Sequence, residues 1–342
     1  MHSAHCDSQS RREFVRRLTV LGAVEAVGIN VEPVAAEPPP ETTTLKVAYS
    51  AAVCEAPSVV AEDLLKGEGF TNVQYTRAPD GSVARRAVAT AQTDITVTFL
   101  APVIVQIDAG EPMTVLAGVH TGCLELFAMR PLRSIAELKG KAVGVTAVDS
   151  NAAQYALLAP MMAYVGLDPR RDITWVIRPV PEQMKLLADG KIDAFLAYPT
   201  VAQELRARKI GHVVVNNGTD RPWSQYFCCM VAGNREFVRK YPVATKRAVR
   251  AILKATQVCA AEPERTAHAL VASGFTGRYD YTLQTLKEIP YARWREYIPE
   301  DAIRFYSLRL NEAGVIKSAP QKIIAQGTDW RFFNELKKEL KG

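Results

Sequence analysis

Residues 113–129 read Met-Thr-Val-Leu-Ala-Gly-Val-His-Thr-Gly-Cys-Leu-Glu-Leu-Phe-Ala-Met. Two apolar, β-rich runs, 113–119 and 124–129, are separated here by only four residues and by no helical pattern. A further extended run of this kind covers 226–232. We interpret the stretches near 119–125 and 224–230 as two crossings of the chain between two lobes.

Strand and helix patterns alternate on both sides of the first crossing. Strands are predicted at 45–49, 73–75 and 94–98, each followed by a helical pattern, and the alternation restarts with strands at 141–145, 173–177 and 193–197. Such alternation predicts parallel strands joined by crossover helices. Beyond residue 232 the pattern is helical. The predicted fold class is α/β, with two βα lobes, a two-segment hinge and a helical C-terminal region.

The composition is that of an ordinary globular protein, with 342 residues, 48% hydrophobic and 23% charged. This length exceeds what one core usually supports, so two domains are expected. The 42 Lys and Arg outnumber the 36 Asp and Glu and give a net charge of +6, but no basic block indicates a nucleic-acid partner. No apolar run reaches the roughly 20 residues that span a bilayer.

The N-terminal residues are typical of an export signal. Residues 10–16, Ser-Arg-Arg-Glu-Phe-Val-Arg, match the twin-arginine signature, and an apolar stretch at 18–30 precedes a small-residue site ending at Ala36. Glu25 departs from an apolar stretch, and a basic amphipathic helix is the alternative. We expect a signal peptide at 1–36, export by the twin-arginine machinery to the periplasm, and a proline-rich extended leader at 37–44.

Motifs for catalysis are absent from the sequence. It contains no phosphate loop, dinucleotide fingerprint, zincin motif or nucleophile elbow. Histidine is scarce, and His212 and His268 are expected to be structural. His120 lies at the first crossing. Two roles are open for it: contact with a ligand or the hinge, or that of an interior histidine with satisfied hydrogen bonds. We predict neither a cofactor nor a metal.

Five cysteines follow the predicted cleavage site, and we interpret them as small buried hydrophobic residues. Their odd number leaves at least one free thiol in an oxidising compartment, and a bridge from Cys259 to another cysteine stays open. Cys228 and Cys229 are adjacent and would point to opposite faces of a strand, so they are not expected to bind one metal ion without distortion. The other two are Cys54 and Cys123.

Several phrases resemble the nitrate/sulfonate/taurine (SsuA/THI5-like) class of ABC-transporter substrate-binding proteins. They are the twin-arginine signal, residues 119–127, the phrase Leu-Lys-Gly-Lys-Ala-Val-Gly-Val at 138–145, and residues 223–230 and 326–331. The resemblance covers essentially all of the chain after the signal. It implies a type II periplasmic-binding-protein fold, no enzymatic activity, a monomer, and docking of the liganded form on a permease with a cytoplasmic ATPase.

The resemblance also implies where a small polar or anionic organic ligand is held. Lobe 1 would comprise 45–120 plus 227–342, and lobe 2 would comprise 121–226. Hydroxyls and backbone N–H groups at strand ends and helix starts hold the ligand in this class, with Ser150 and Asn151 capping a helix. Asp149 in the cleft would disfavour a simple anion such as nitrate. The predicted ligand-binding residues are Ser50, Ala51, Thr98, Phe99, His120, Asp149, Ser150, Asn151, Tyr198, Gln225 and Tyr226, with His120 and Gln225 on the hinge strands.

An enzyme on the same fold is the alternative. The broad superfamily includes the synthase of the thiamine pyrimidine, which consumes its own histidine and pyridoxal phosphate and carries a cysteine-rich iron motif. The adjacent pair Cys228-Cys229 resembles that motif but is shorter. A binder of pyrimidine precursors is a related alternative.

Overall fold

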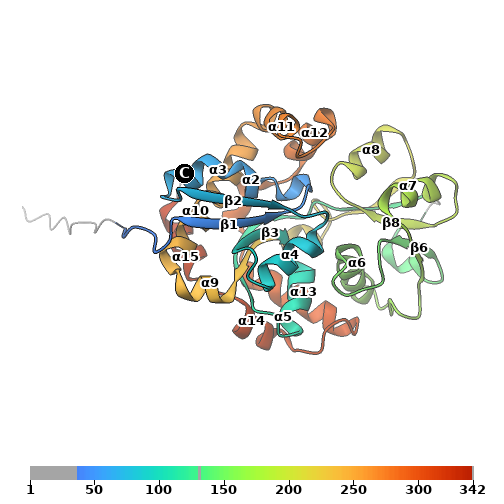
Figure 1. Ribbon diagram of the computed structural model, residues 1–342. Coiled ribbons are helices and arrows are strands. Elements are labelled where there is room, and N and C mark those ends of the chain that lie inside the picture. The colour runs from blue at the N-terminus through green and yellow to red at the C-terminus, as the bar shows by residue number, and fades with distance from the viewer. Residues whose placement is uncertain (1–36, 130–131, 341–342) are drawn as a thin grey trace, which may run out of the picture. The chain divides into compact units, whose positions relative to one another are not determined.

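The computed structural model describes residues 37–129 and 132–340, so the predicted signal peptide lies outside the described residues. The chain divides into two compact units, residues 1–38 and 39–342, and the second unit holds all the described helices and strands. These form two five-stranded sheets with helices around each (Figure 1).

The first sheet has the strand order β2-β1-β3-β10-β4. β1, β2 and β3 are parallel, while β10 lies antiparallel between β3 and β4. The strands are β1 (Thr44–Tyr49), β2 (Asn72–Arg77), β3 (Ile95–Phe99), β4 (Met113–Thr121) and β10 (Phe227–Asn234). The chain therefore leaves this sheet at the end of β4 and returns to its middle with β10.

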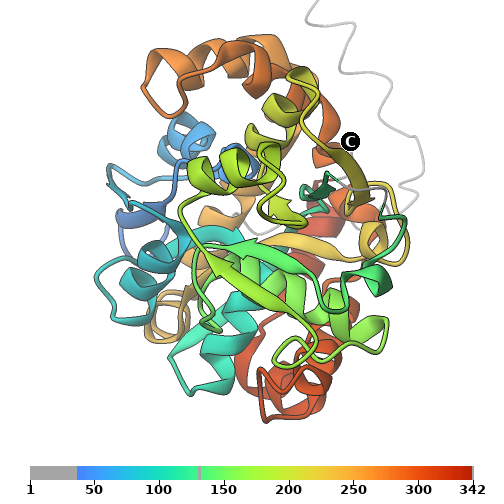
Figure 2. The same cartoon turned by 90° about the vertical axis from the view of Figure 1, so that its right-hand side faces the viewer.

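The second sheet has the order β7-β6-β8-β5-β9, and Figure 2 turns it, in green and yellow-green, toward the viewer. β6, β7 and β8 are parallel, and β5 is antiparallel to β8 and β9. The strands are β5 (Glu125–Ala128), β6 (Ala142–Val145), β7 (Thr174–Ile177), β8 (Ala194–Ala197) and β9 (His212–Asn216). Every strand of this sheet comes from one continuous segment of the chain.

Helices pack on both sheets, which explains why the inner strands β3, β5, β8 and β10, and also the edge strand β4, are buried along their whole length. The helices between strands are α2 (Pro57–Val60), α3 (Glu62–Gly67), α4 (Gly81–Ala89), α5 (Leu100–Asp108), α6 (Ala153–Tyr164), α7 (Val180–Ala188) and α8 (Val201–Ala207). The 3-10 helices are η1 (Val53–Glu55), η2 (Ile135–Leu138), η3 (Trp223–Gln225) and η4 (Tyr291–Glu296). The predicted α/β class is confirmed.

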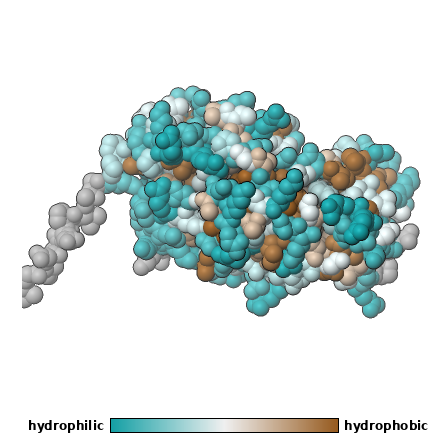
Figure 3. Space-filling model, turned by 90° about the horizontal axis from the view of Figure 1, so that it is seen from below, coloured by the Kyte–Doolittle hydropathy of each residue, from teal (hydrophilic) through white to brown (hydrophobic). Residues whose placement is uncertain are grey.

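The chain after β10 is helical, as predicted. Its helices are α9 (Arg235–Lys240), α10 (Pro242–Ala261), α11 (Pro263–Ala272), α12 (Tyr279–Glu288), α13 (Pro299–Glu312), α14 (Pro320–Gly327) and α15 (Arg331–Glu339). Among the described residues, none of the helices combines the length and the apolar character needed to cross a bilayer. Hydrophilic residues predominate on the face seen in Figure 3, where the hydrophobic patches are small and separated.

Two local predictions are wrong. Ser150 and Asn151 do not cap α6, which begins at Ala153 after Ala152 and has no side-chain cap; instead, the backbone N–H of Asn151 donates to the Asp149 carboxylate at 2.7 Å. Gln225 lies in η3 rather than on a hinge strand. The cause is Trp223, which is buried and packs edge-on against Phe305, so the chain coils before β10 begins.

Candidate functional site

Four buried polar side chains meet where β1 and β3 end. The Ser50 hydroxyl, just after β1, donates to Glu55 Oε2 at 2.6 Å, and Arg85 Nη1 donates to Thr98 Oγ1 on β3 at 3.3 Å. All four residues are at most 5% exposed. Ligands of open α/β sheets bind at this end of the strands, so the group is a candidate binding site. We call Ser50, Glu55, Arg85 and Thr98 the polar cluster.

Helix α4 places Arg85 in this cluster. Asp80 begins the helix by accepting hydrogen bonds from the backbone N–H groups of Ser82 and Val83. Arg85 then falls on the same face as the buried Ala84 and Val88 and is itself fully buried. Burial lowers the pKa of Arg85 to about 10, with Glu55 opposing the shift, so the guanidinium remains positively charged at neutral pH.

Glu55 is the acidic member of the cluster. Burial raises its pKa to about 8, and Cys54 adds to the shift, while the Ser50 hydrogen bond and Arg85 oppose it. Glu55 is therefore largely protonated at neutral pH. Glu55 Oε1 and Arg85 Nε have no hydrogen-bond partner among the described residues, and buried polar atoms are costly when unpaired. A bound polar molecule would satisfy them.

The second sheet contributes to the same place. Arg85 Nη2 donates to the backbone oxygen of Asn151 at 2.7 Å, and the rings of Phe99 and Tyr198 lie 5.7 Å apart, centre to centre. These contacts join the ends of β3 and α4 to the end of β8 and the turn before α6. The space is kept open by Gly81, since a Cβ there would lie 3.2 Å from Arg85 Nη1 and 3.9 Å from both Glu55 Oε1 and Thr98 Oγ1.

Gln154 fixes the second-sheet side. Its Oε1 accepts from the backbone N–H of Thr146 at 2.8 Å, and its Nε2 donates to the backbone oxygen of Leu196 at 2.9 Å. Gln154 is fully buried near the start of α6, so these bonds tie the helix to the ends of β6 and β8. The turn carrying Asn151 and the residue after β8, Tyr198, are positioned by this link.

An open cavity of about 540 Å³ adjoins the polar cluster. It is lined by α4 residues including Arg86, by the end of α5, and by Asp149 and Asn151. Asp149 is exposed there. The lining of the cavity does not include the polar cluster, but Gln106 Oε1 and Asn151 Oδ1 in that lining lack partners among the described residues, as Glu55 Oε1 and Arg85 Nε do.

The predicted site residues thus divide into two groups. Ser50, Thr98, Phe99, Asn151 and Tyr198 come together around Arg85. The others do not share these contacts: Ala51, Asp149 and Gln225 are exposed, Ser150 is half-buried, and Tyr226 stacks on Phe305 of α13 at 4.0 Å.

His120 lies on β4, as predicted, and is fully buried. Its Nδ1 is 2.6 Å from the backbone oxygen of Thr121, and its Nε2 is 3.0 Å from that of Cys54. A carbonyl oxygen only accepts, so the ring nitrogen that carries hydrogen is the donor. His120 therefore links β4 to η1, behind the polar cluster.

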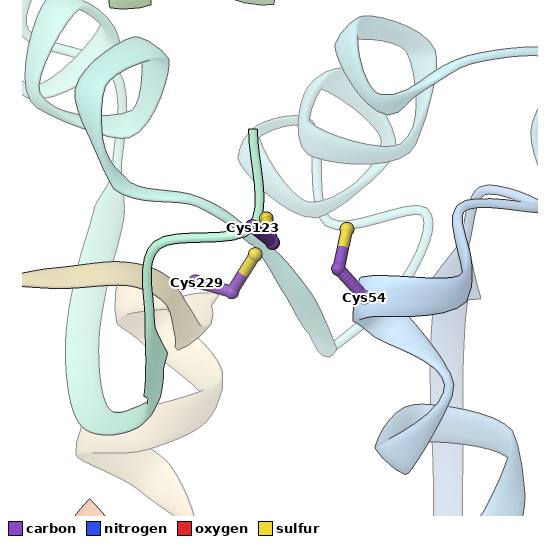
Figure 4. A group of neighbouring side chains, drawn as sticks. All are labelled: Cys54, Cys123 and Cys229. Carbon is purple, nitrogen blue, oxygen red and sulfur yellow. The ribbon is translucent and has the colours of Figure 1, made fainter. Parts of the chain in front are cut away.

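Cys54, Cys228, Cys229 and Cys259 are buried, as predicted, but the arrangement of the adjacent pair differs from the prediction. Cys228 Sγ lies 3.7 Å from Cys123 Sγ, and Cys229 Sγ lies within 4.8 Å of Cys54 and Cys123 (Figure 4). Both members of the adjacent pair thus approach Cys123, because the β10–β4 register shifts on each side of Cys229 and the regular alternation of faces is lost. All five described cysteines are free thiols, and Cys259 on α10 is buried apart from this group.

A second link between the sheets lies at α8. Arg206 pairs with Glu125 of β5 and with Glu288 of α12, the latter at 2.6 Å, and Gln203 Nε2 donates to Glu288 Oε2 at 2.9 Å. Burial raises the pKa of Glu125, against the effect of Arg206. Cys123 and Arg206 line a cavity of about 250 Å³ at this place.

Sequence reasoning missed Glu55 and Arg85. The available signal was the position of Arg85 on the apolar face of a helical pattern, since a charged residue is rarely buried without a partner or a function. Glu55 carried a weaker signal, its place just after a strand.

The two sheets, the double crossing and the site where their ends meet define a two-lobed binding-protein fold. The chain belongs to the NMT1-like family, whose model matches residues 38–273. This match confirms the family resemblance inferred from the sequence. No curated protein sequence matches the chain.

Solved structures share the fold. The periplasmic nitrate-binding protein NrtA of Synechocystis PCC 6803 has a TM-score of 0.71 at 15% identity, over 89% of this chain and 90% of that one. The alkanesulfonate-binding protein SsuA of Xanthomonas axonopodis pv. citri, bound to MOPS, has a TM-score of 0.67 at 16% identity, over 86% and 100%. The E. coli aliphatic sulphonate binding protein SsuA gives 0.65 at 16%, over 85% and 94%.

Proposed function

We propose that this protein is the solute-binding component of an ABC importer. It captures a small polar or anionic organic molecule between lobe 1 (45–120 plus 227–342) and lobe 2 (121–226) and delivers it to a permease with a cytoplasmic ATPase. The observation that carries the proposal is the polar cluster, where a buried cation and a buried carboxyl have unpaired atoms at the meeting point of two sheets. The nitrate- and sulfonate-binding proteins with this fold support it.

The ligand's chemistry follows from the cluster. The Arg85 guanidinium would bind an anionic group, and the Ser50 and Thr98 hydroxyls lie beside it. Glu55, protonated at neutral pH, would donate to a carbonyl or similar acceptor of the ligand. We infer a small organic acid whose anionic group meets Arg85 and whose second polar group meets Glu55.

Binding would act by closing the lobes. A ligand that contacts both lobes favours the closed state by its greater affinity for that state. Arg85 and Asn151 already join the two sides, so a ligand at Arg85 would strengthen this junction. The closed surface is then what the permease recognises, and the protein itself carries out no chemical step.

The location of the protein is part of the proposal. The twin-arginine signal at 1–36 would direct export to the periplasm, where importers of this class collect their solutes. Cleavage after Ala36 leaves the net charge at +6, because the removed segment holds four acidic residues and four arginines.

Ligand binding is tested with the purified protein and a panel of nitrate, alkanesulfonates, pyrimidines and aromatic acids, by thermal shift and calorimetry. Mass spectrometry of copurified small molecules extends the panel. We expect one class to stabilise the protein and to be recovered unchanged. Conversion of the bound compound would favour the enzyme alternative, and failure of every panel compound and every copurified compound to stabilise a folded protein would contradict the proposal.

Arg85→Gln locates the site. We expect affinity for the panel compound to fall about 10- to 100-fold, because a hydrogen-bonded charge is lost. Arg86→Gln is the matched control, since its side chain is exposed and lines the open cavity instead. Equal losses in both variants would place the ligand in the 540 Å³ cavity and not in the polar cluster.

A further inference from the structure

Four cysteines from three separate segments converge beside the crossings of the chain. Cys54 comes from η1, Cys123 from the link between β4 and β5, and Cys228 and Cys229 from the start of β10. The Sγ atoms of Cys54, Cys123 and Cys229 all lie within 4.8 Å of one another, with Cys54 across from Cys123 and Cys229 (Figure 4). Cys228 adds a fourth sulfur, 3.7 Å from Cys123.

These separations fit sulfur ligands around one ion. Two sulfurs bound tetrahedrally at about 2.3 Å from a zinc ion lie about 3.8 Å apart, and the Cys123–Cys228 separation is 3.7 Å. The three separations among Cys54, Cys123 and Cys229 are at most 4.8 Å, so those sulfurs lie within about 1 Å of that spacing. Thiolates prefer soft or borderline ions such as Cu⁺ and Zn²⁺ over Mg²⁺ or Ca²⁺.

Ordinary packing of thiols does not explain the group. Cys259 shows what a single packed cysteine looks like in this chain, fully buried on α10 and outside the cluster. Access to the cluster also exists, because Cys123 is only half-buried and lines the 250 Å³ cavity with Arg206 and Glu288. An ion can reach the sulfur of Cys123 by this route.

We propose that Cys54, Cys123 and Cys229, with Cys228 beside them, form a binding site for a thiophilic d¹⁰ cation, Zn²⁺ or Cu⁺. Each thiol that binds releases its proton to solvent as the sulfur–metal bond forms, so no oxidant or reductant is consumed. The ion would tie η1 to both crossings of the chain. The site borders the polar cluster, because Cys54 and Glu55 are neighbours in η1, but none of its sulfurs belongs to that cluster.

The test uses the full chain, reduced and stripped of metal with a chelator, then titrated with Zn²⁺ or Cu⁺. We expect one ion per chain by elemental mass spectrometry. Peptide mapping after alkylation of the folded chain should show that the ion protects the half-buried Cys123, while the fully buried Cys259 stays unreactive with or without the ion. Absence of binding for both ions, or a Cys123–Cys228 disulfide that forms in air and survives metal loading, would overturn the proposal.

Variants then assign the ligands. Cys229→Ser should weaken binding at least about tenfold, whereas Cys259→Ser, the matched control for losing one buried thiol, should bind as the unaltered chain does. Equal affinity in the two variants would contradict the assignment. If Cys229→Ser fails to fold, the affinity of Cys123→Ser is compared with that of Cys259→Ser instead. The protection from alkylation in the unaltered chain needs no variant and tests the same assignment.

Discussion

Gly122 shows how closely the chain is packed at the first crossing. A Cβ at this position would lie 1.9 Å from the backbone oxygen of Asn217, far inside contact distance. The neighbouring backbone N–H of Asn217 donates to the Leu124 oxygen, so the two chain segments between the sheets are hydrogen-bonded side by side. Only glycine allows this approach.

Gly122→Ala should therefore destabilise the protein by about 3 kcal/mol, since a backbone atom cannot move aside as a flexible side chain can. Gly277→Ala is the control, because nothing lies within 4 Å of its Cβ position. Urea unfolding measures both. A urea midpoint for Gly122→Ala equal to that of the control would show that the backbone at the crossing accommodates a Cβ without loss of stability.

At the residue scale, the sequence predicted which residues lie at the site better than it predicted which residues they contact. Ser50, Thr98 and Tyr198 were predictable because strand ends follow from the alternation of strand and helix patterns. That Arg85 lies among them was not, because it depends on which face of α4 meets the sheet. The approach of both Cys228 and Cys229 to Cys123 depends on register shifts in β10, which leave no mark in the sequence.

Among the elements, α8 and α12 form a link that the sequence did not indicate. Arg206 on α8 holds Glu288 on α12, while Arg208, directly after α8, pairs with Glu204 of that helix. The first pair joins a helix of the second sheet to the C-terminal helical region, and the second pair does not. Substitutions in the two pairs therefore distinguish an effect on lobe closure from an effect on helix α8 itself.

Glu288→Gln should lower the affinity for the stabilising panel compound about two- to fivefold, as expected for losing a partly exposed ion pair that favours the closed state. Glu204→Gln should leave the affinity unchanged. Calorimetry gives the affinities, and small-angle scattering of the ligand-free protein should show a larger radius of gyration only for Glu288→Gln. An unchanged affinity and radius would mean that this link has no part in closure.

Elements as such were largely predictable, and their ends were not. The apolar residues of α10 recur at three- and four-residue steps and are buried as that spacing requires, including Ala244, Ala248 and Ile252. The predicted start of α6 is wrong because the turn before the helix is held by another hydrogen bond. In that turn the Asp149 carboxylate accepts from the backbone N–H of Asn151. Residue preferences favour Ser150 and Asn151 as helix caps, but the hydrogen bond to Asp149 keeps them in the turn before the helix.

For the whole molecule, export can be tested apart from binding. Replacing Arg11 and Arg12 by lysine should abolish export, because the twin-arginine machinery recognises that pair. Replacing Arg16 and Arg17 by lysine is the control of equal charge. Cell fractionation and mass spectrometry of the N-terminus report the outcome. An exported protein that does not begin at Glu37, or equal export of both variants, would contradict the proposed signal.

The position of β10 in the first sheet has a consequence for synthesis on the ribosome. The strands of the second sheet, residues 125–216, are complete before β10 has emerged, so that sheet can form first. The first sheet cannot, since β10 separates β3 from β4 and more than a hundred residues lie between β4 and β10. Such distant pairing slows folding. The nascent chain must therefore leave β4 without its strand partner until the second lobe has been made.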